Sequence, residues 1–378
     1  MNTHVYSRQS ILNDRHRALG TQFEASWNDM PIPQNYAADP YVETETVRNN
    51  AGLFDVSALR LIDVSGPDSL AALNAMLTSD IARIKPGQSS ISNIVDDEGS
   101  LIDDVLVYCD GPNAYRISHG GGALEDVLPA FAEGRNVQFR KDNDTHILSL
   151  QGPKALEILA PHTPMNLADL RYFEHQRTTL FGRDVSIARG GYSAERGYEV
   201  FCKAADAVFL WDQILEAGKP FGATAVSWSC LDIVRVEGAL LFFPFDMPEG
   251  DTTPWEAGVD WSVDLSKPAF RGKQALERRR AEVRTAQAGI EIDHHEAVEP
   301  GAKIFKDGRE IGVVNSTTYS RHLMRSLALV HIAPEFKSFG TEVEVRGDGG
   351  SFKARVVKTP FYDPLRLRTH PLEERAPR

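Results

Sequence analysis

The chain has few cysteines. Only Cys109, Cys202 and Cys230 occur among its 378 residues, and no two of them form a C-x-x-C pair. Disulfide frameworks and zinc knuckles both need closely spaced cysteines, so neither kind of site is expected. We therefore predict a protein of a reducing compartment without a structural metal ion.

Long apolar stretches are also missing. No segment approaches the ~20 consecutive apolar residues of a membrane-spanning helix, and residues 1–20 contain no apolar core of signal-peptide length. These absences predict a cytoplasmic protein that has no membrane partner.

Positive charge is not in excess, because 41 Lys and Arg residues stand against 53 Asp and Glu residues and give a formal net charge of −12. Nucleic-acid backbones are bound by clustered cations, so no nucleic-acid partner is expected. The motifs of dinucleotide folds, P-loops and hydrolase nucleophile elbows are absent too. The neighbouring His294 and His295 would diverge on a strand, so we predict no metal site there.

What the chain does contain is typical of a folded globular protein, with 42% hydrophobic and 25% charged residues. Strand-then-helix patterns recur over residues 60–77, 146–159 and 183–218, which favours an α+β fold with helices on one face of each sheet. After about residue 285, short apolar runs separated by turns predict a small β-barrel or sandwich. We expect one region of two interleaved α+β subdomains over residues 1–280 and a barrel domain over residues 285–378.

Two acids lie in the second arm of a predicted hairpin, whose turn is the polar stretch 96–99. Asp103 and Asp104 are neighbours on that strand, so one of their carboxyl groups should point inward. A buried carboxyl group must find hydrogen-bond donors or shift its pKa, and a proton-handling site uses such a group. A purely structural acid in the hairpin fits the same spacing.

Two further candidates follow apolar strands. The glycine-rich turn from residue 189 ends in Tyr198 and Glu199, and a carboxylate can accept two parallel N–H bonds from a flat heterocycle whose face an aromatic ring covers. Gly-Tyr-Glu is also a common strand start, which the pattern alone does not exclude. His119 could donate a proton near neutral pH, although an exposed loop histidine would look the same.

Six segments occur in a fixed order along the chain: residues 12–20, 52–57, 99–108, LQGP at 150–153, residues 191–199 and TPWEAG at 253–258. Together they resemble the glycine-cleavage T-protein (aminomethyltransferase) family over nearly the whole chain. The resemblance implies a ring of three domains around a central channel that binds tetrahydrofolate, with the pterin deepest.

The resemblance also implies roles for individual residues. Asp104 matches the catalytic aspartate of the family, where it also contacts the folate. Tyr198 and Glu199 match the positions that contact the pterin. Apart from the resemblance, we hypothesise that His119 protonates a leaving oxygen, since histidine titrates near neutral pH.

Some segments depart from the family pattern. Leu231 replaces an arginine, and residues 315–323 differ from the usual TSGxxSPxL. These departures favour the folate-dependent demethylases of this fold, which move a methyl group from oxygen, nitrogen or sulfur of a small substrate to tetrahydrofolate. The stretch PFYDP at 360–364 is similar to their aromatic O-demethylase branch.

Three alternatives stay open from the resemblance. An aminomethyltransferase would use a lipoyl carrier protein as its partner. A non-enzymatic folate-binding factor of iron–sulfur assembly carries a cysteine motif that residues 267–274 lack. The folate half of a flavin-linked amine dehydrogenase would need a nucleotide-binding half that this chain does not contain.

Overall fold

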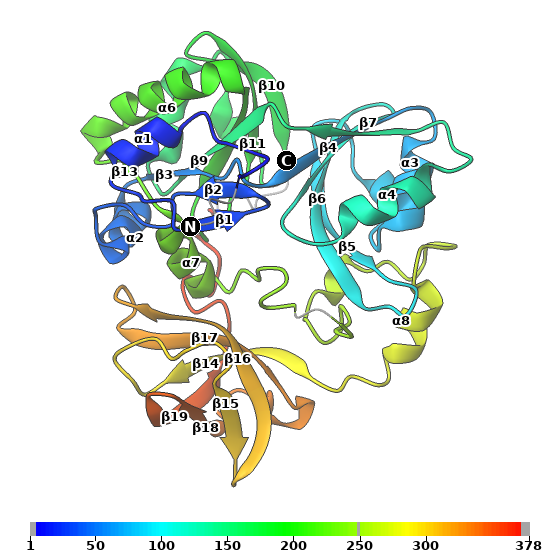
Figure 1. Cartoon of the computed structure of the whole chain (residues 1–378), viewed down its shortest axis with the longest axis vertical. Coiled ribbons are helices and arrows are strands. Elements are labelled where there is room, and N and C mark those ends of the chain that lie inside the picture. Colours follow the sequence, from blue (N-terminus) through cyan, green and yellow to red (C-terminus); the bar gives the residue numbers. More distant parts are fainter. Residues whose placement is uncertain (1–4, 248–249, 372–378) are drawn as a thin grey trace.

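The computed structural model describes residues 5–247 and 250–371. Three lobes, each built around its own sheet, surround the middle of the molecule (Figure 1). Two lobes are α+β and the third is a β-barrel, as the strand and helix patterns predict.

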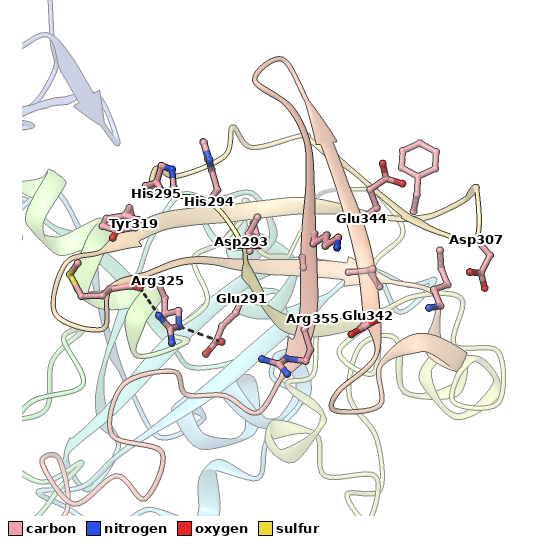
Figure 2. Close-up of a pocket in the computed structure, with 17 residues that line it drawn as sticks. Glu291, Asp293, His294, His295, Asp307, Tyr319, Arg325, Glu342, Glu344 and Arg355 are labelled. Carbon is pink, nitrogen blue, oxygen red and sulfur yellow. Dashed lines mark hydrogen bonds and ion pairs between the residues drawn. The ribbon is translucent and has the colours of Figure 1, made fainter.

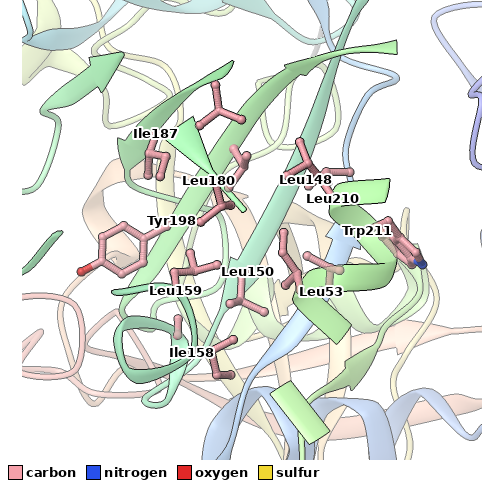
Figure 3. Close-up of a cluster of buried hydrophobic side chains, with 14 of the residues drawn as sticks. Leu53, Leu148, Leu150, Ile158, Leu159, Leu180, Ile187, Tyr198, Leu210 and Trp211 are labelled. Atoms are coloured by element: carbon pink, nitrogen blue, oxygen red, sulfur yellow. The ribbon is translucent and has the colours of Figure 1, made fainter. Parts of the chain in front are cut away.

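The first lobe contains a six-stranded sheet. In spatial order its strands are β10 (His175–Leu180), β11 (Arg183–Arg189), β12 (Gly197–Lys203), β9 (Thr145–Gln151), β3 (Gly52–Asp55) and β13 (Thr224–Ala225). One face packs on α5 (Ala155–Leu159) and α6 (Ala204–Gly218) through a buried apolar cluster (Figure 3). The remaining elements of this lobe are α1 (Asn13–Ala18), β1 (Ala25–Trp27), β2 (Met30–Ile32), α2 (Pro40–Asn49) and α7 (Trp228–Glu237).

The second lobe contains a five-stranded sheet. Its order is β5 (Ser89–Val95), β6 (Leu101–Gly111), β7 (Ala114–His119), β4 (Arg60–Ser65) and β8 (Gln138–Asp142), with α3 (Ser69–Met76) and α4 (Leu124–Ala132) on one face. The predicted hairpin is confirmed, because β5 and β6 pair antiparallel around the polar turn and place Asp104 opposite Asn93. Successive side chains of β6 then point alternately to the helix-covered face and to the other face of the sheet.

The third lobe is a closed barrel rather than a sandwich, and all six short apolar runs form its strands. In order around the barrel these are β14 (Ala286–Ile292), β17 (Arg325–Ile332), β16 (Arg309–Ser320), β15 (Lys303–Lys306), β18 (Glu342–Gly347) and β19 (Gly350–Val357). Between the second lobe and the barrel, the basic segment at residues 273–284 contains α8 (Lys273–Arg279).

After β19 the chain runs back to the first lobe. The Tyr362 hydroxyl donates to Glu195 Oε1 at 2.6 Å, and the Tyr362 amide donates to the Glu237 carbonyl at 2.8 Å. Further along, the guanidinium of Arg189 donates to the Thr369 carbonyl at 2.8 Å. The segment after the barrel therefore attaches the third lobe to the first through buried polar contacts.

Across residues 5–247 and 250–371, no helix is both long enough and apolar enough to cross a lipid bilayer.

Candidate active site between the lobes

Asp104 lies on the face of β6 that turns toward the first lobe. Its neighbours on that face, Leu106 and Tyr108, pack in a cluster with Phe201 of β12, and the rings of Tyr108 and Phe201 meet edge to face at 5.5 Å. Asp103 lies on the opposite, helix-covered face with Val105. The hairpin thus directs two adjacent carboxyl groups into two different environments.

The carboxyl group of Asp104 is set deep in the protein yet keeps some accessible surface, as expected of a group that faces an internal space. Burial raises its pKa to about 7, and the negative charge of Asp103 adds to the increase. A carboxyl group with this pKa can gain or lose a proton at neutral pH.

Glu199 approaches the same region from β12, on the face that also carries Phe201. The Tyr108 hydroxyl donates to Glu199 Oε2 at 3.5 Å, and burial raises the pKa of Glu199 to about 7. Tyr108 is four residues beyond Asp104 on β6, a separation of about 13 Å along a strand. Glu199 of the first sheet therefore contacts the face of β6 that also carries Asp104.

Arg116 of β7 supports the Tyr108 end of this region. Its guanidinium lies over the rings of Tyr108, at 4.7 Å, and Phe201, at 4.3 Å. Its positive charge opposes the rise in the pKa of Glu199. The aromatic rings and the cation together hold Tyr108 where its hydroxyl can reach Glu199.

Tyr198 is not on the face of Glu199. It is fully buried in the apolar cluster beneath α5 and α6, together with Leu150 and Ile158 (Figure 3). Its hydroxyl accepts a hydrogen bond from Arg196 Nε at 3.1 Å. Tyr198 cannot cover a ring held by Glu199, because consecutive residues of β12 point to opposite faces.

His119 is placed differently from both sequence interpretations. It is a buried residue at the end of β7, not an exposed loop residue, and it pairs with Val105 on the helix-covered side of the sheet. Its Nδ1 lies 3.1 Å from Asp103 Oδ2. His119 therefore contacts Asp103 and does not share the face of Asp104.

A cavity of about 440 Å³ lies between the first lobe and the barrel. Aromatic and aliphatic side chains dominate its lining, with a few polar groups; it is lined by Ala25, Ser26, Trp27, Ile32, Gln34, Tyr192, Trp228, Leu231, Asp232, Arg235, Phe242, Phe245, Pro300, Asn315, Ser316 and Thr317. Asp104 and Glu199 are not among these residues. Tyr192, which lines the cavity, is within electrostatic reach of Asp104. Burial raises the pKa of the Tyr192 phenol above its usual range, and the negative charge of Asp104 adds to the increase.

The sequence analysis missed most of this lining. The rings of Trp27 and Phe242 meet at 4.9 Å, and Phe242 stacks on Phe245 at 5.6 Å, although β1 and the segment after α7 are more than 200 residues apart. The dense aromatic stretch at 242–245 was the available signal. Leu231 and residues 315–317, noted as departures from the family pattern, do line the cavity.

Arg235 of α7 fixes one wall of the cavity. Its guanidinium donates to Asp232 at 2.7 Å, to Asp246 at 2.5 Å and to the Ser316 hydroxyl at 2.8 Å. These partners come from α7, from the segment after it and from the barrel strand β16. The arginine therefore joins the barrel to the first lobe at the cavity.

A larger depression, of about 830 Å³, lies on the barrel (Figure 2). Its lining carries charges of both signs, and the carboxylate of Glu291 lies 3.8 Å from the guanidinium of Arg325. The rings of His294 and His295 are 5.6 Å apart. Within the part of the chain that the structure describes, no group of three His, Cys, Asp or Glu side chains is arranged to hold a metal ion.

Comparisons with known proteins agree with this architecture. The family model of the GCVT N-terminal domain matches residues 12–267, and that of the glycine cleavage T-protein C-terminal barrel domain matches residues 286–363. A solved structure of glycine cleavage system aminomethyltransferase T from Bartonella henselae is similar, with a TM-score of 0.87, 26% identity and coverage of 94% of this chain and 98% of that chain. The predicted fold class is confirmed.

Two relatives show the range of names within the family. The chain is 42% identical over 366 residues to the heme-dependent oxidative N-demethylase gamma subunit of Ectopseudomonas mendocina, covering 94% of this chain and 96% of that protein. It is 34% identical over 326 residues to an aminomethyltransferase of Shouchella clausii, covering 85% and 89%. With matches over both the α+β region and the barrel, the chain belongs to the glycine-cleavage T-protein (aminomethyltransferase) family.

Proposed function

We propose that this chain is a tetrahydrofolate-dependent one-carbon transferase that accepts the carbon of a methyl group from a small methylated substrate. The observation that carries the proposal is the placement of Asp104 and Glu199, two deeply set carboxyl groups from separate sheets that are connected through Tyr108 on the Asp104 face of β6. Family membership supports the choice of cofactor.

The residues of the region fit a reduced pterin. The Glu199 carboxylate can accept parallel hydrogen bonds from the adjacent N–H groups of the ring edge, and Tyr108, rather than Tyr198, is the aromatic residue next to it. The aromatic lining of the cavity suits the remainder of the cofactor. When bound, tetrahydrofolate supplies amine nitrogens that take up a one-carbon unit.

Asp104 is the proposed catalytic residue. With a pKa of about 7, its carboxyl group can hold a proton or release one near neutral pH, which suits proton exchange with an amine nitrogen. Its negative form would also favour a positively charged methylated substrate. Aromatic side chains around the cavity would exclude water and orient the reactants.

We further propose nitrogen, rather than oxygen or sulfur, as the atom that carries the methyl group. The relative with 42% identity is named an oxidative N-demethylase subunit. Oxidation of an N-methyl group by a heme-dependent partner subunit, as the name of that relative implies, would release the methyl carbon as formaldehyde, whereas direct transfer would move an intact methyl group. The two routes predict different folate products, 5,10-methylene-tetrahydrofolate and 5-methyl-tetrahydrofolate.

A glycine-cleavage aminomethyltransferase is the second candidate, favoured by relatives of that name at 34% identity over 85% of this chain. That activity would require a lipoyl carrier protein. Leu231 and residues 315–317, which depart from the family pattern, line the cavity, and this supports a different substrate. A non-enzymatic folate-binding factor would bind the cofactor without turnover.

The test is to incubate the protein with tetrahydrofolate and either formaldehyde or a panel of methylamino, methoxy and methylthio compounds, and to identify the folate product by mass spectrometry. We expect 5,10-methylene-tetrahydrofolate to form from formaldehyde faster than without protein, and faster than with Asp104→Asn. Ammonia release from an aminomethyl-lipoyl carrier would establish the second candidate instead. Tetrahydrofolate binding with no product from any donor would contradict both enzymatic proposals.

A further inference from the structure

A second pair of ionisable groups lies behind Asp104, on the other face of the same sheet. Asp103 and His119 are both fully buried as side chains, and Nδ1 of His119 is 3.1 Å from Oδ2 of Asp103. The same Oδ2 accepts a hydrogen bond from the Leu124 amide at 3.2 Å, at the start of α4. Since Asp103 precedes Asp104 on β6, this pair is the nearest buried ionisable pair in sequence to the proposed catalytic group.

The pair is incompletely satisfied. Among the residues that the structure describes, Oδ1 of Asp103 and Nε2 of His119 have no hydrogen-bond partner. The backbone of Gly122 also lies against Asp103, because a Cβ atom at Gly122 would come within 2.4 Å of the Asp103 carboxyl carbon. The charge of Asp103 is thus enclosed by protein, where a charge acts on its neighbours more strongly than it does in water.

Charged groups around His119 come from four elements. Asp103 of β6 and Glu125 of α4 are acidic, and Glu125 Oε1 lies 3.7 Å from His119 Nε2. Arg60 of β4 contacts Glu125 at 3.1 Å, and Lys141 of β8 pairs with the same carboxylate. The guanidinium of Arg8 lies near this group, within electrostatic reach of Arg60 and Glu125. Glu125 therefore has fixed cationic partners, whereas the Asp103 carboxylate faces the imidazole of His119.

We propose that His119 is a positioning residue of the site: by gaining or losing its proton beside Asp103, it sets the charge that Asp104 experiences from behind the strand. A protonated imidazole next to the Asp103 carboxylate cancels the repulsion and lets Asp104 ionise. A neutral imidazole leaves the negative charge in place and raises the pH at which Asp104 ionises. The coupling of charge between the His119–Asp103 pair and Asp104 does not depend on folate chemistry. Its effect on turnover rests on the proposed function.

The coupling can be measured without any ligand. Carbon-13 NMR of aspartate-labelled protein would follow the carboxyl titration of Asp104, assigned by its loss in Asp104→Asn, in the wild type, His119→Gln and Asp103→Asn. His294→Gln, on the barrel, is the matched control. Amide spectra establish that each variant is folded.

We expect the Asp104 titration midpoint to fall by about one to two pH units in Asp103→Asn, because the neighbouring negative charge is removed. It should rise in His119→Gln, because glutamine can occupy the space but cannot gain a proton, and it should stay unchanged in His294→Gln. An unchanged Asp104 midpoint in folded His119→Gln would overturn the proposal. This test holds even if Asp103→Asn does not fold.

The pH profile of turnover provides the second readout. If the proposed function holds, the pH dependence of kcat/KM should move in the same direction as the NMR midpoint in His119→Gln. A shifted NMR midpoint in a protein without one-carbon transfer would keep the coupling and refute the function. A uniform loss of activity with unmoved midpoints would show that His119 is only structural.

Discussion

The region around Asp104 and Glu199 and the depression on the barrel differ in how their carboxyl groups are neutralised. The barrel depression, at about 830 Å³, is larger than the cavity between the lobes, at about 440 Å³, but two of its acids, Glu291 and Glu344, have arginine partners. Arg346 and Ser351 hold the pKa of Glu344 down at about 2, whereas burial raises the pKa of Glu199 to about 7. A buried carboxyl group without a close cationic partner, rather than the volume of a cavity, therefore marks the place where proton chemistry can occur.

The strongest way to break this comparison is to remove the proposed catalytic carboxyl group. Asp104→Asn should lower turnover by about 10²- to 10⁴-fold, the usual contribution of a general acid or base, while leaving tetrahydrofolate binding largely intact. Asp293→Asn, in the barrel depression, is the matched control and should retain full turnover. Unchanged kinetics in the Asp104 variant would end the assignment.

Glu199→Gln tests the second carboxyl group. Losing a charged acceptor for two N–H donors should weaken binding of tetrahydrofolate by about 10- to 100-fold, as measured by calorimetry. Glu342→Gln makes the same chemical change in the barrel depression and should bind the cofactor as the wild type does. Equal affinities in the two variants would show that the region around Glu199 and the barrel depression do not differ as proposed.

The dependence of stability on pH follows from the raised pKa of Glu199. Its pKa moves from 4.5 to about 7 on folding, so the folded state holds a proton that the unfolded state has lost between these values. The stabilising contribution is therefore complete below about pH 4.5 and is lost as the pH rises through 7. Relative to the wild type, Glu199→Gln should gain about 1–3 kcal/mol in unfolding free energy as the pH rises from 5 to 8. Chemical denaturation of both proteins at the two pH values measures this difference. A relative gain in stability as the pH falls would contradict the prediction.

The smallest expected effect concerns Tyr198. Its hydroxyl bonds to Arg196 away from the face of Glu199, so Tyr198→Phe should leave tetrahydrofolate affinity within about twofold, because the lost hydroxyl does not face the proposed pterin position. Tyr108→Phe removes the donor to Glu199 and should weaken binding by several-fold. If Tyr198→Phe weakened binding more than Tyr108→Phe, the assignment of the aromatic partner would have to be reversed.

Local patterns were enough to predict most of the secondary structure. The alternation of apolar residues in β5 and β6 and the polar turn between them specify the hairpin without information from elsewhere in the chain. The six barrel strands were predictable for the same reason. Whether they form a barrel or a sandwich depends on pairings such as that of β14 with β19, which are distant in sequence.

The site was less predictable, because it depends on faces and on distant contacts. The alternation rule that separates Asp103 from Asp104 also separates Tyr198 from Glu199, and the expectation that both contact one ring neglected it. The side on which His119 lies follows from the register of β7 against β6. No local pattern could bring Trp27, Phe242 and Ser316 to one cavity.

The return of the chain from the barrel to the first lobe limits how a ligand can enter. Tyr362 and Thr369 attach the segment after β19 to Glu195 and Arg189, and Arg235 joins β16 to α7 at the cavity itself. Swinging the barrel outward as a rigid body would break these buried polar contacts together. A ligand would therefore enter the cavity through small rearrangements of the side chains at its rim. Phe245 is one of these side chains and is already 54% exposed.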